Sequence, residues 1–361
     1  MSNVLGDNVV VNLYGESHSN KIGVTILGMP AGIEIDDIAI KEALSKRRPI
    51  LGVDTSRVET DPYVFVSGVS NNKTNGEPLT LEITNANTKS SDYDNLQNIP
   101  RPGHADYVGY IKYGDKYDFH GGGFFSGRLT APLVAVASIV IKALERKGIV
   151  IGTHILKCGN VNDSHISSID DINKINSKTY SLIDNLEEQL NDEITKAKEE
   201  KDSIGGITET AVYGLPVGLG DKSFASVEGV ISKAIFGVGA IKGIEFGEGF
   251  NFANLKGSEA NDAFEVKDNK VVTTTNHNGG INGGISNGMP ITFNCVVKPT
   301  PSISKPQQSV NLKTMENVEI EIKGRHDPAI IRRIPIVITS VTALAVLDLL
   351  ISEYGKDYFK E

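Results

Sequence analysis

The sequence contains no tryptophan and only two cysteines, Cys158 and Cys295, among its 361 residues. Two thiols this far apart neither cross-link a chain of this size nor supply the ligands of a zinc site. The motifs H-E-x-x-H and C-x-x-C are absent as well, so we expect no metal ion. The G-x-x-x-x-G-K-[ST] phosphate loop is also missing, which argues against a P-loop nucleotide hydrolase.

Basic residues are fewer than acidic ones: 36 lysines and arginines against 45 aspartates and glutamates give a formal net charge of -9. A general nucleic-acid-binding protein needs a basic excess to neutralise phosphates, so we expect no nucleic-acid partner. An anionic small molecule is still compatible with this charge, because a site can gather a few arginines on an acidic chain.

The N-terminal segment lacks a basic stretch followed by an apolar one, which predicts no secretory signal. The longest apolar runs cover 131–141, too short to span a bilayer, and 334–350, which polar residues interrupt. We interpret both runs as buried core helices. The sequence therefore predicts a cytoplasmic, soluble protein with no membrane partner.

The pattern of apolar residues predicts both helices and strands. Strand-like alternation covers 8–14, 63–69, 206–213 and 289–297, and helical periodicity covers 37–46, 133–146, 183–198, 226–236 and 334–352. Because the two kinds of segment do not alternate as βαβ units, we expect an α+β fold rather than a doubly wound α/β fold. We expect one domain over 1–361, with a charged surface helix near 183–198 that carries a single apolar stripe.

Three of the seven histidines occupy turn-like settings beside glycine or proline: His18, His104 and His326. Histidine exchanges protons readily near neutral pH, so such residues are candidates for acid–base chemistry. A single histidine of this kind is most often a surface or turn residue, but three settings favour a shared site. The surroundings of His120, His154, His165 and His277 are less distinctive, and we interpret these four as surface or turn-stabilising residues.

Arginines accompany two of these histidines: Arg101 precedes His104, and Arg325 precedes His326. Guanidinium groups are preferred ligands for phosphate and carboxylate, so the pattern indicates an anionic substrate that undergoes proton transfer. The segment 298–302 (KPTPS) offers an ammonium and hydroxyls for a second phosphate. We interpret Arg332 and Arg333 as ordinary surface charges. Residue chemistry alone thus predicts an enzyme for a multiply anionic small molecule, without naming the reaction.

Nine motifs in order resemble the chorismate synthase family, nearly from end to end. They are 15–19 (GESHS), 101–114 (RPGHADY through KYG), 121–128 (GGG through SGR), 202–206 (DSIGG), 214–220 (GLPVGLG), 241–247 (IKGIEFG), 278–288 (NGGINGGISNG), 298–302 (KPTPS) and 324–328 (GRHDP). The resemblance implies a helical layer sandwiched between antiparallel sheets, assembled as a homotetramer.

The resemblance also implies an activity: the anti 1,4-elimination of phosphate and a ring hydrogen from 5-enolpyruvylshikimate 3-phosphate, giving chorismate in the shikimate pathway. Reduced FMN would be required without net redox change. His18 would protonate the departing phosphate, His104 would protonate the reduced flavin, and Asp327 would handle the proton at flavin N5. Ser17 and Ser126 would support the two histidines as proton relays.

Binding roles follow from the same resemblance. Substrate phosphate and carboxylates would be bound by Arg47, Arg48, Arg101, Arg128 and Arg325, with Arg57 as a further candidate. Backbone at Gly239, Ala240 and Gly288 would approach the flavin, and Lys298 and Ser302 would lie near its phosphate. Residues 237–243 have the wrong spacing for a dinucleotide fingerprint, so we expect reducing equivalents to come from a separate NAD(P)H-dependent flavin reductase.

The chain departs from the family pattern in three places. Residues 124–130 read FFSGRLT where the family usually has RSSARET, so Ser126 and Arg128 remain while an arginine and a glutamate are replaced. The loop after Arg48 is short, and Thr339 stands where a glutamate is usual. Two other functions stay open at this point: a flavin-dependent oxidoreductase, and a non-catalytic anion-binding relative.

Overall fold

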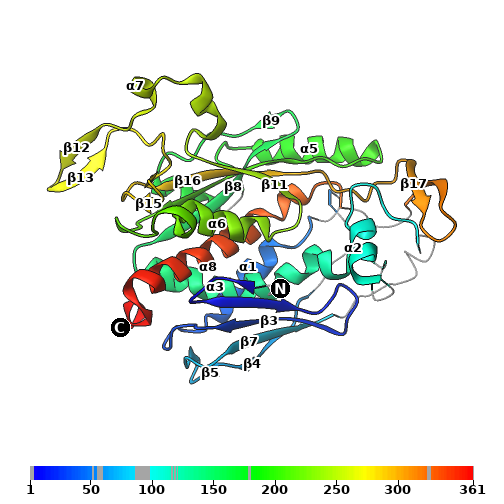
Figure 1. Cartoon of the computed structure of the whole chain (residues 1–361), viewed down its shortest axis with the longest axis horizontal. Coiled ribbons are helices and arrows are strands. Elements are labelled where there is room, and N and C mark those ends of the chain that lie inside the picture. The colour runs from blue at the N-terminus through cyan, green and yellow to red at the C-terminus, as the bar shows by residue number, and fades with distance from the viewer. Residues whose placement is uncertain are drawn as a thin grey trace.

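A computed structural model describes residues 4–50, 53–54, 60–85, 98–114, 117, 119, 121–177, 180–322 and 327–360. Among these residues, two five-stranded sheets are antiparallel throughout and enclose a layer of helices (Figure 1). This arrangement is the α+β fold that the residue pattern predicts and the layered sandwich that the family resemblance implies. One hydrophobic core draws on both sheets and on the helices between them.

The first sheet has the strand order β1-β2-β3-β7-β4. Its strands are β1 (Val4–Leu5), β2 (Val10–Tyr14), β3 (Lys21–Leu27), β4 (Tyr63–Ser67) and β7 (Leu79–Thr84). In β3, Ile22, Val24 and Ile26 are fully buried, as expected for alternate residues that face the core. Tyr14, the last residue of β2, is followed by the segment that contains Ser17 and His18.

The second sheet has the strand order β11-β16-β10-β8-β9. Its strands are β8 (Val150–Cys158), β9 (Val161–Asn162), β10 (Gly206–Tyr213), β11 (Ile241–Phe246) and β16 (Ile291–Val297). Residues from Thr208 to Val212 in β10 are buried without a break, because this central strand is covered on both faces. The end of β16 leads into Lys298, one of the predicted cofactor-binding residues.

Two long helices form the centre of the helical layer. α3 (Thr130–Arg146) and α8 (Pro335–Tyr354) pack on each other, and both contact β8. Segments Gly127–Arg146 and Pro335–Tyr354 are long and apolar enough to cross a membrane, but 72% and 94% of their apolar windows are buried inside the protein. This burial supports the prediction of core helices, although the first segment is longer than the run over 131–141.

The remaining helices and hairpins surround this centre. The helices are α1 (Asp37–Lys46), α2 (Asp106–Tyr113), α4 (Ile169–Ser177), α5 (Leu186–Glu199), α6 (Val227–Phe236) and α7 (Gly257–Ala260). The hairpin strands are β5 (Val69–Ser70), β6 (Lys73–Thr74), β12 (Phe264–Lys267), β13 (Lys270–Thr273), β14 (Ile281–Asn282), β15 (Ile285–Ser286), β17 (Gln307–Asn311) and β18 (Glu316–Ile320). Short 3-10 turns are η3 (Gly123–Phe125), η4 (Gly127–Leu129), η5 (Ser223–Ala225), η6 (Gly249–Asn254), η7 (Ile330–Arg332) and η8 (Lys356–Phe359).

The predicted elements match these bounds closely where periodicity is strong. α1 and β10 have the predicted bounds, and α6 begins one residue later than predicted. The charged helix expected near 183–198 is α5, in which Leu186, Leu190 and Ile194 are buried while Ile183 lies before the helix and is exposed. The one-domain description of 1–361 stays a prediction.

Candidate active site

The loop after β2 packs against the glycine triplet at 121–123. The backbone N–H of Ser17 donates to the carbonyl of Gly123 at 3.2 Å. A Cβ built on Gly121 would lie 2.5 Å from Cε1 of His18 and 3.0 Å from Oγ of Ser17, and Gly121 has a φ of +61°. Only glycine combines this backbone conformation with this close contact. The triplet therefore brings Ser17 and His18 into a defined position.

The second histidine lies in a network around Asp106, the first residue of α2. His104 Nδ1 is 2.6 Å from Asp106 Oδ1, and Tyr117 donates its hydroxyl to the same oxygen at 2.9 Å. Arg101 donates from Nε to Oδ2 at 2.7 Å and from Nη2 to Oδ1 at 2.8 Å. Burial favours the neutral acid, but the hydrogen bonds from Arg101 and His104 outweigh it and hold the pKa of Asp106 well below its usual range.

Arg101 links this network to the glycine triplet. Its Nη2 donates to the carbonyl of Gly121 at 2.6 Å, and its Nη1 donates to Ser302 Oγ at 3.3 Å. The arginine side chain is only 3% exposed. Arg101 therefore joins the surroundings of His18 to those of His104, and its predicted role as a substrate ligand stays a prediction.

The predicted cofactor residues at the end of β16 lie beside the His104 turn. Lys298 donates from Nζ to the carbonyl of Gly103 at 2.5 Å, and its backbone N–H donates to the carbonyl of Ala240 at 2.9 Å. Burial, together with the nearby Lys242 ammonium, lowers the pKa of Lys298. Ala240 has a φ of +73°, a conformation that costs energy for a residue with a side chain. Gly239 has open space where a Cβ would be.

The residues after the triplet are held by a separate set of contacts. Ser126 Oγ accepts from the backbone N–H of Arg128 and thereby caps η4. Arg128 pairs with Asp61 and donates from Nε to Asn85 Oδ1 at 2.9 Å. Asn85 in turn donates to the carbonyl of Ser19 at 2.8 Å. Arg128 is thus tied to the loop that carries His18.

Two more predicted arginines directly follow α1. Arg47 is buried, and its Nη2 donates at 3.0 Å both to the carbonyl of Gly127 and to Thr130 Oγ1. Arg48 is more exposed and donates to the carbonyl of Thr60 at 3.3 Å. Arg57, Arg325 and His326 lie outside the residues that the structure describes.

The interpretation of Arg332 as a surface charge is wrong. Arg332 is 6% exposed, lies 3.8 Å from Asp54 and donates to Asn191 at 2.5 Å. Arg333 is half-buried: its Nη1 is 2.9 Å from Asp327 Oδ2, and its Nε donates to the carbonyl of Arg47 at 2.8 Å. Asp327 is therefore connected to Arg47 through Arg333. Asp327 and Arg333 are only six residues apart, but Arg47, Asp54 and Asn191 are distant in the sequence, so sequence alone could not show these contacts.

Gly288 lies apart from these residues. It follows β15 and packs against Val217, whose Cγ2 would be 2.9 Å from a Cβ at this position. The seven residues of β16 separate Gly288 from Lys298, and a strand of that length spans about 23 Å. β15 and α2 accordingly lie at opposite ends of the molecule (Figure 1).

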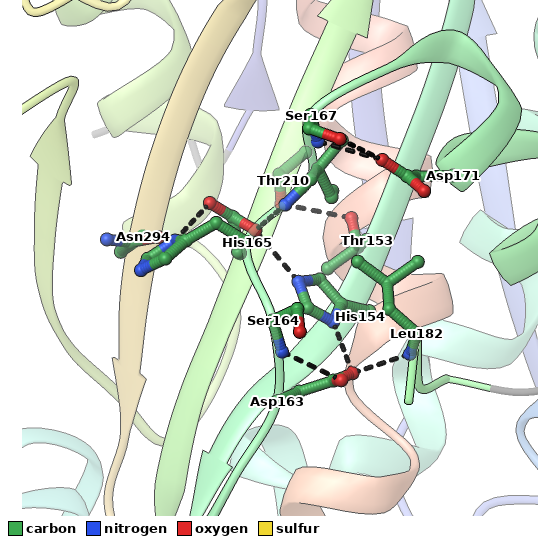
Figure 2. A network of polar contacts seen from close by, with 12 residues as sticks. Thr153, His154, Asp163, Ser164, His165, Ser167, Asp171, Leu182, Thr210 and Asn294 are labelled. Carbon is green, nitrogen blue, oxygen red and sulfur yellow. Dashed lines mark hydrogen bonds and ion pairs between the residues drawn. The ribbon is translucent and has the colours of Figure 1, made fainter. Parts of the chain in front are cut away.

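A second polar cluster lies on the second sheet (Figure 2). His154 in β8 is fully buried, so its interpretation as a surface or turn residue is wrong. Its Nδ1 is 3.0 Å from Asp163 Oδ2 and its Nε2 is 2.9 Å from Glu209 Oε2. His165 is 71% exposed, as expected, and contacts Glu209 at 2.8 Å.

Four residues of the candidate site carry no predicted role: Asp61, Asn85, Asp106 and Tyr117. Asp106 is the one with a local signal, because an aspartate two residues after a turn histidine can reach the imidazole. Asp61 and Asn85 are distant in the sequence from their partner Arg128, and no local pattern connects Tyr117 with Asp106, eleven residues before it.

Comparison with known proteins identifies the family of the chain. The sequence profile of the family named chorismate synthase matches residues 9–351. The chain belongs to the chorismate synthase family. The chorismate synthase of Lancefieldella parvula is 44% identical, with 98% of this chain and 97% of that protein covered. That of Methanobrevibacter smithii is 41% identical, with 96% of each chain covered.

A solved chorismate synthase structure confirms the fold. Its TM-score is 0.75 at 24% identity, and the match covers 97% of this chain and 93% of that one. At this identity the similarity supports the architecture alone. Family membership and the named relatives support chorismate synthase function, and the two other functions considered from the sequence are not favoured.

Proposed function

We propose that this chain is a carbon–oxygen lyase that eliminates phosphate from 5-enolpyruvylshikimate 3-phosphate to give chorismate. The observation that carries the proposal is the convergence of two histidines on one glycine turn. His18 packs on Gly121, whose carbonyl accepts a hydrogen bond from Arg101, and Arg101 also contacts His104. Two proton-transfer groups beside one turn suit an elimination in which phosphate leaves as a ring proton is lost.

An anionic substrate is supported by the cations that gather around the turn. Arg47 and Arg128 hold the loop over 126–130, and Arg48 remains partly open to solvent. Departure of phosphate is easier when the group is protonated or paired with cations. In the proposal His18 supplies the proton to the departing phosphate, and these arginines hold its oxygens.

The residues around Lys298 fit a flavin phosphate. Lys298 and Lys242 place two ammonium groups near each other, and Ser302 adds a hydroxyl. Gly239 leaves open space beside the backbone, and the positive φ of Ala240 sets the direction of the chain there. When bound, reduced FMN would supply electron density to the reacting ring without net redox change. His104 would provide a proton from its imidazole, and Asp327, held by Arg333, would accept one at its carboxylate.

Assembly as a homotetramer is part of the proposal. Gly288 lies about one strand length from Lys298 within the chain, so in the proposal the two residues belong to flavin sites shared between copies. Reducing equivalents would come from a separate NAD(P)H-dependent flavin reductase, and we propose a cytoplasmic location.

The test is anaerobic phosphate release from 5-enolpyruvylshikimate 3-phosphate with FMN reduced by dithionite, while the flavin spectrum is followed. Chorismate formation with the flavin still reduced is the expected result. Flavin oxidation in step with product would instead indicate an oxidoreductase. Substrate binding without release would indicate a non-catalytic relative.

A variant of His18 sharpens this test. His18→Ala is expected to bind substrate as the unmodified protein does and to lose about 10²- to 10⁴-fold in turnover, the usual worth of a positioned acid. His165→Ala, an exposed histidine away from the turn, is the control and should turn over normally. Normal turnover by His18→Ala would remove the acid role from this residue.

A further inference from the structure

The carboxylate of Asp106 is buried and fully engaged. Its side chain is 1% exposed. Oδ2 accepts from the backbone N–H of Arg101 at 2.9 Å and from Arg101 Nε at 2.7 Å. Oδ1 faces three groups: Arg101 Nη2, Tyr117 Oη and His104 Nδ1. A carboxylate with this many donors stays ionised and has one orientation.

The protonation of His104 Nδ1 follows from two competing contacts. Arg101 Nη2, which can only donate, lies 3.2 Å from Nδ1, whereas Asp106 Oδ1 lies 2.6 Å away. A bare Nδ1 would accept weakly from Arg101 but would place its lone pair against an anionic oxygen at the shorter distance. A protonated Nδ1 makes a short charge-assisted bond to Asp106, and bonds of that kind are about twice as strong as neutral ones. Because the contact to Asp106 is the shorter of the two, we assign the hydrogen to Nδ1.

We infer that Asp106 is a positioning residue that keeps the proton of His104 on Nδ1, so that Nε2 is the nitrogen that gives and takes protons. This inference rests on the proposed function, in which His104 is a proton donor. Asp106 acts through His104 and holds the ring in one tautomer and one orientation.

Aromatic packing holds the ring of Tyr117, whose hydroxyl donates to Asp106. The Tyr117 ring contacts Phe119 edge to face at 5.0 Å and Phe125 at 6.4 Å between centroids. A Cβ on Gly109 of α2 would lie 2.3 Å from Tyr117 Cε2, so the glycine makes room for the ring. Phe125 belongs to the segment that departs from the family pattern. In this chain Phe125, which departs from the family pattern, thus helps to hold the tyrosine that donates to Asp106.

The direct test is the tautomer of His104, measured by ¹⁵N NMR of the imidazole in the full-length protein, with His104→Gln used to assign the signal. Unmodified protein is expected to show a protonated Nδ1 and, at high pH, a bare Nε2. In Asp106→Asn the bare-Nδ1 tautomer should appear, because an amide no longer favours hydrogen at that nitrogen. A predominant bare Nδ1 in the unmodified protein would overturn the inference.

Asp106→Asn removes the carboxylate that pairs with the buried Arg101 guanidinium, which destabilises the fold. Tyr117→Phe therefore serves as a second variant, because it removes one neutral bond and keeps both charges. Because Tyr117→Phe leaves the Asp106 carboxylate facing Nδ1, it should keep the protonated-Nδ1 tautomer. A tautomer population that stays unchanged in folded Asp106→Asn, or that changes as much in Tyr117→Phe, would contradict the role of Asp106.

Turnover gives an independent readout. Asp106→Asn should lower kcat by about 10- to 100-fold with little change in KM, as expected when a proton donor loses its orientation. In a His104→Gln background the same substitution should have almost no further effect, because its target is gone. Additive losses would mean that Asp106 acts only on the fold. Absence of turnover by the unmodified protein would count against the proposed function, while the NMR result would still decide the tautomer.

Discussion

The imidazole of His18 lies directly against the α-carbon of Gly121, with no room for a side chain between them. Gly121→Ala would have to displace His18 or the backbone, and its φ of +61° adds strain of about 1–3 kcal/mol. We expect a folded variant with a lower urea midpoint and strongly reduced turnover. Gly127→Ala is the matched control, because no heavy atom lies within 4 Å of its added Cβ. Equal turnover in the two variants would show that the His18 contact is unimportant.

Buried His154 provides a test of stability away from the turn. Replacing it with glutamine removes the imidazole that lies between Asp163 and Glu209, and breaking a buried pair of this kind typically costs about 3–5 kcal/mol. His165→Gln is the control, because this exposed histidine should contribute at most about 1 kcal/mol. Urea unfolding of both variants gives the comparison. Similar losses of unfolding free energy in the two variants would mean that the pairing of His154 with Asp163 and Glu209 contributes little to stability.

The same cluster should make stability depend on pH. Burial opposes the charged imidazole, but hydrogen bonds to Asp163 and Glu209 outweigh it and raise the pKa of His154. Burial likewise opposes the two carboxylates, but His154 and backbone N–H groups lower the pKa of Asp163 and of Glu209. A histidine whose pKa is raised by folding stabilises the folded protein at pH values below its unfolded pKa. A carboxylate whose pKa is lowered by folding stabilises the folded protein at pH values above its unfolded pKa. The contribution should therefore be fully present between about pH 4.5 and 6.5.

Its measurement is the difference in unfolding free energy between unmodified protein and His154→Gln across pH. We expect this difference to be largest in that window, to shrink as pH rises through the folded pKa of His154, and to shrink again in acid. A difference that grows steadily towards alkaline pH would contradict the assigned charges.

Thr339, the departure in the last helix, takes part in a chain of hydroxyl groups. It donates to Thr153 Oγ1 at 2.8 Å, which lies 3.0 Å from Thr210 Oγ1. Thr339→Val should destabilise by about 1 kcal/mol, because a buried hydrogen bond is lost. Thr342→Val in the same helix should be neutral or stabilising, since the buried Thr342 hydroxyl has no hydrogen-bond partner among the described residues. Thermal unfolding of both variants gives the comparison. A larger loss of stability in Thr342→Val than in Thr339→Val would contradict the hydrogen bond assigned to Thr339.

Both cysteines should be inert in the folded protein. Burial raises the pKa of Cys158 to about 11 and that of Cys295 to about 12, and both side chains are fully buried. The thiolate is the reactive form, so a thiol reagent at pH 8 should label neither residue until denaturant is added. Rapid labelling of the native protein would mean that this part of the core opens readily.

Much of the fold could be predicted because apolar periodicity reports burial within one element. α1 and α6 each bury one stripe, whereas α8 and the middle of β10 are buried on all sides, and the bounds of all four agree with the pattern to within one or two residues. The glycine triplet and the turns around His18 and His104 were visible for the same local reason. Covalent neighbours are enough to mark a turn.

The tertiary structure decided which of these local features meet. His18 and His104 converge through Gly121 and Arg101, whereas His154, without a distinctive local pattern, is the most buried of the described histidines. Arg332 is buried because its partners come from distant segments, and Gly288 is separated from Lys298 by the length of β16. Contacts of this kind depend on how sheets and helices pack, and packing joins residues that no sequence spacing relates.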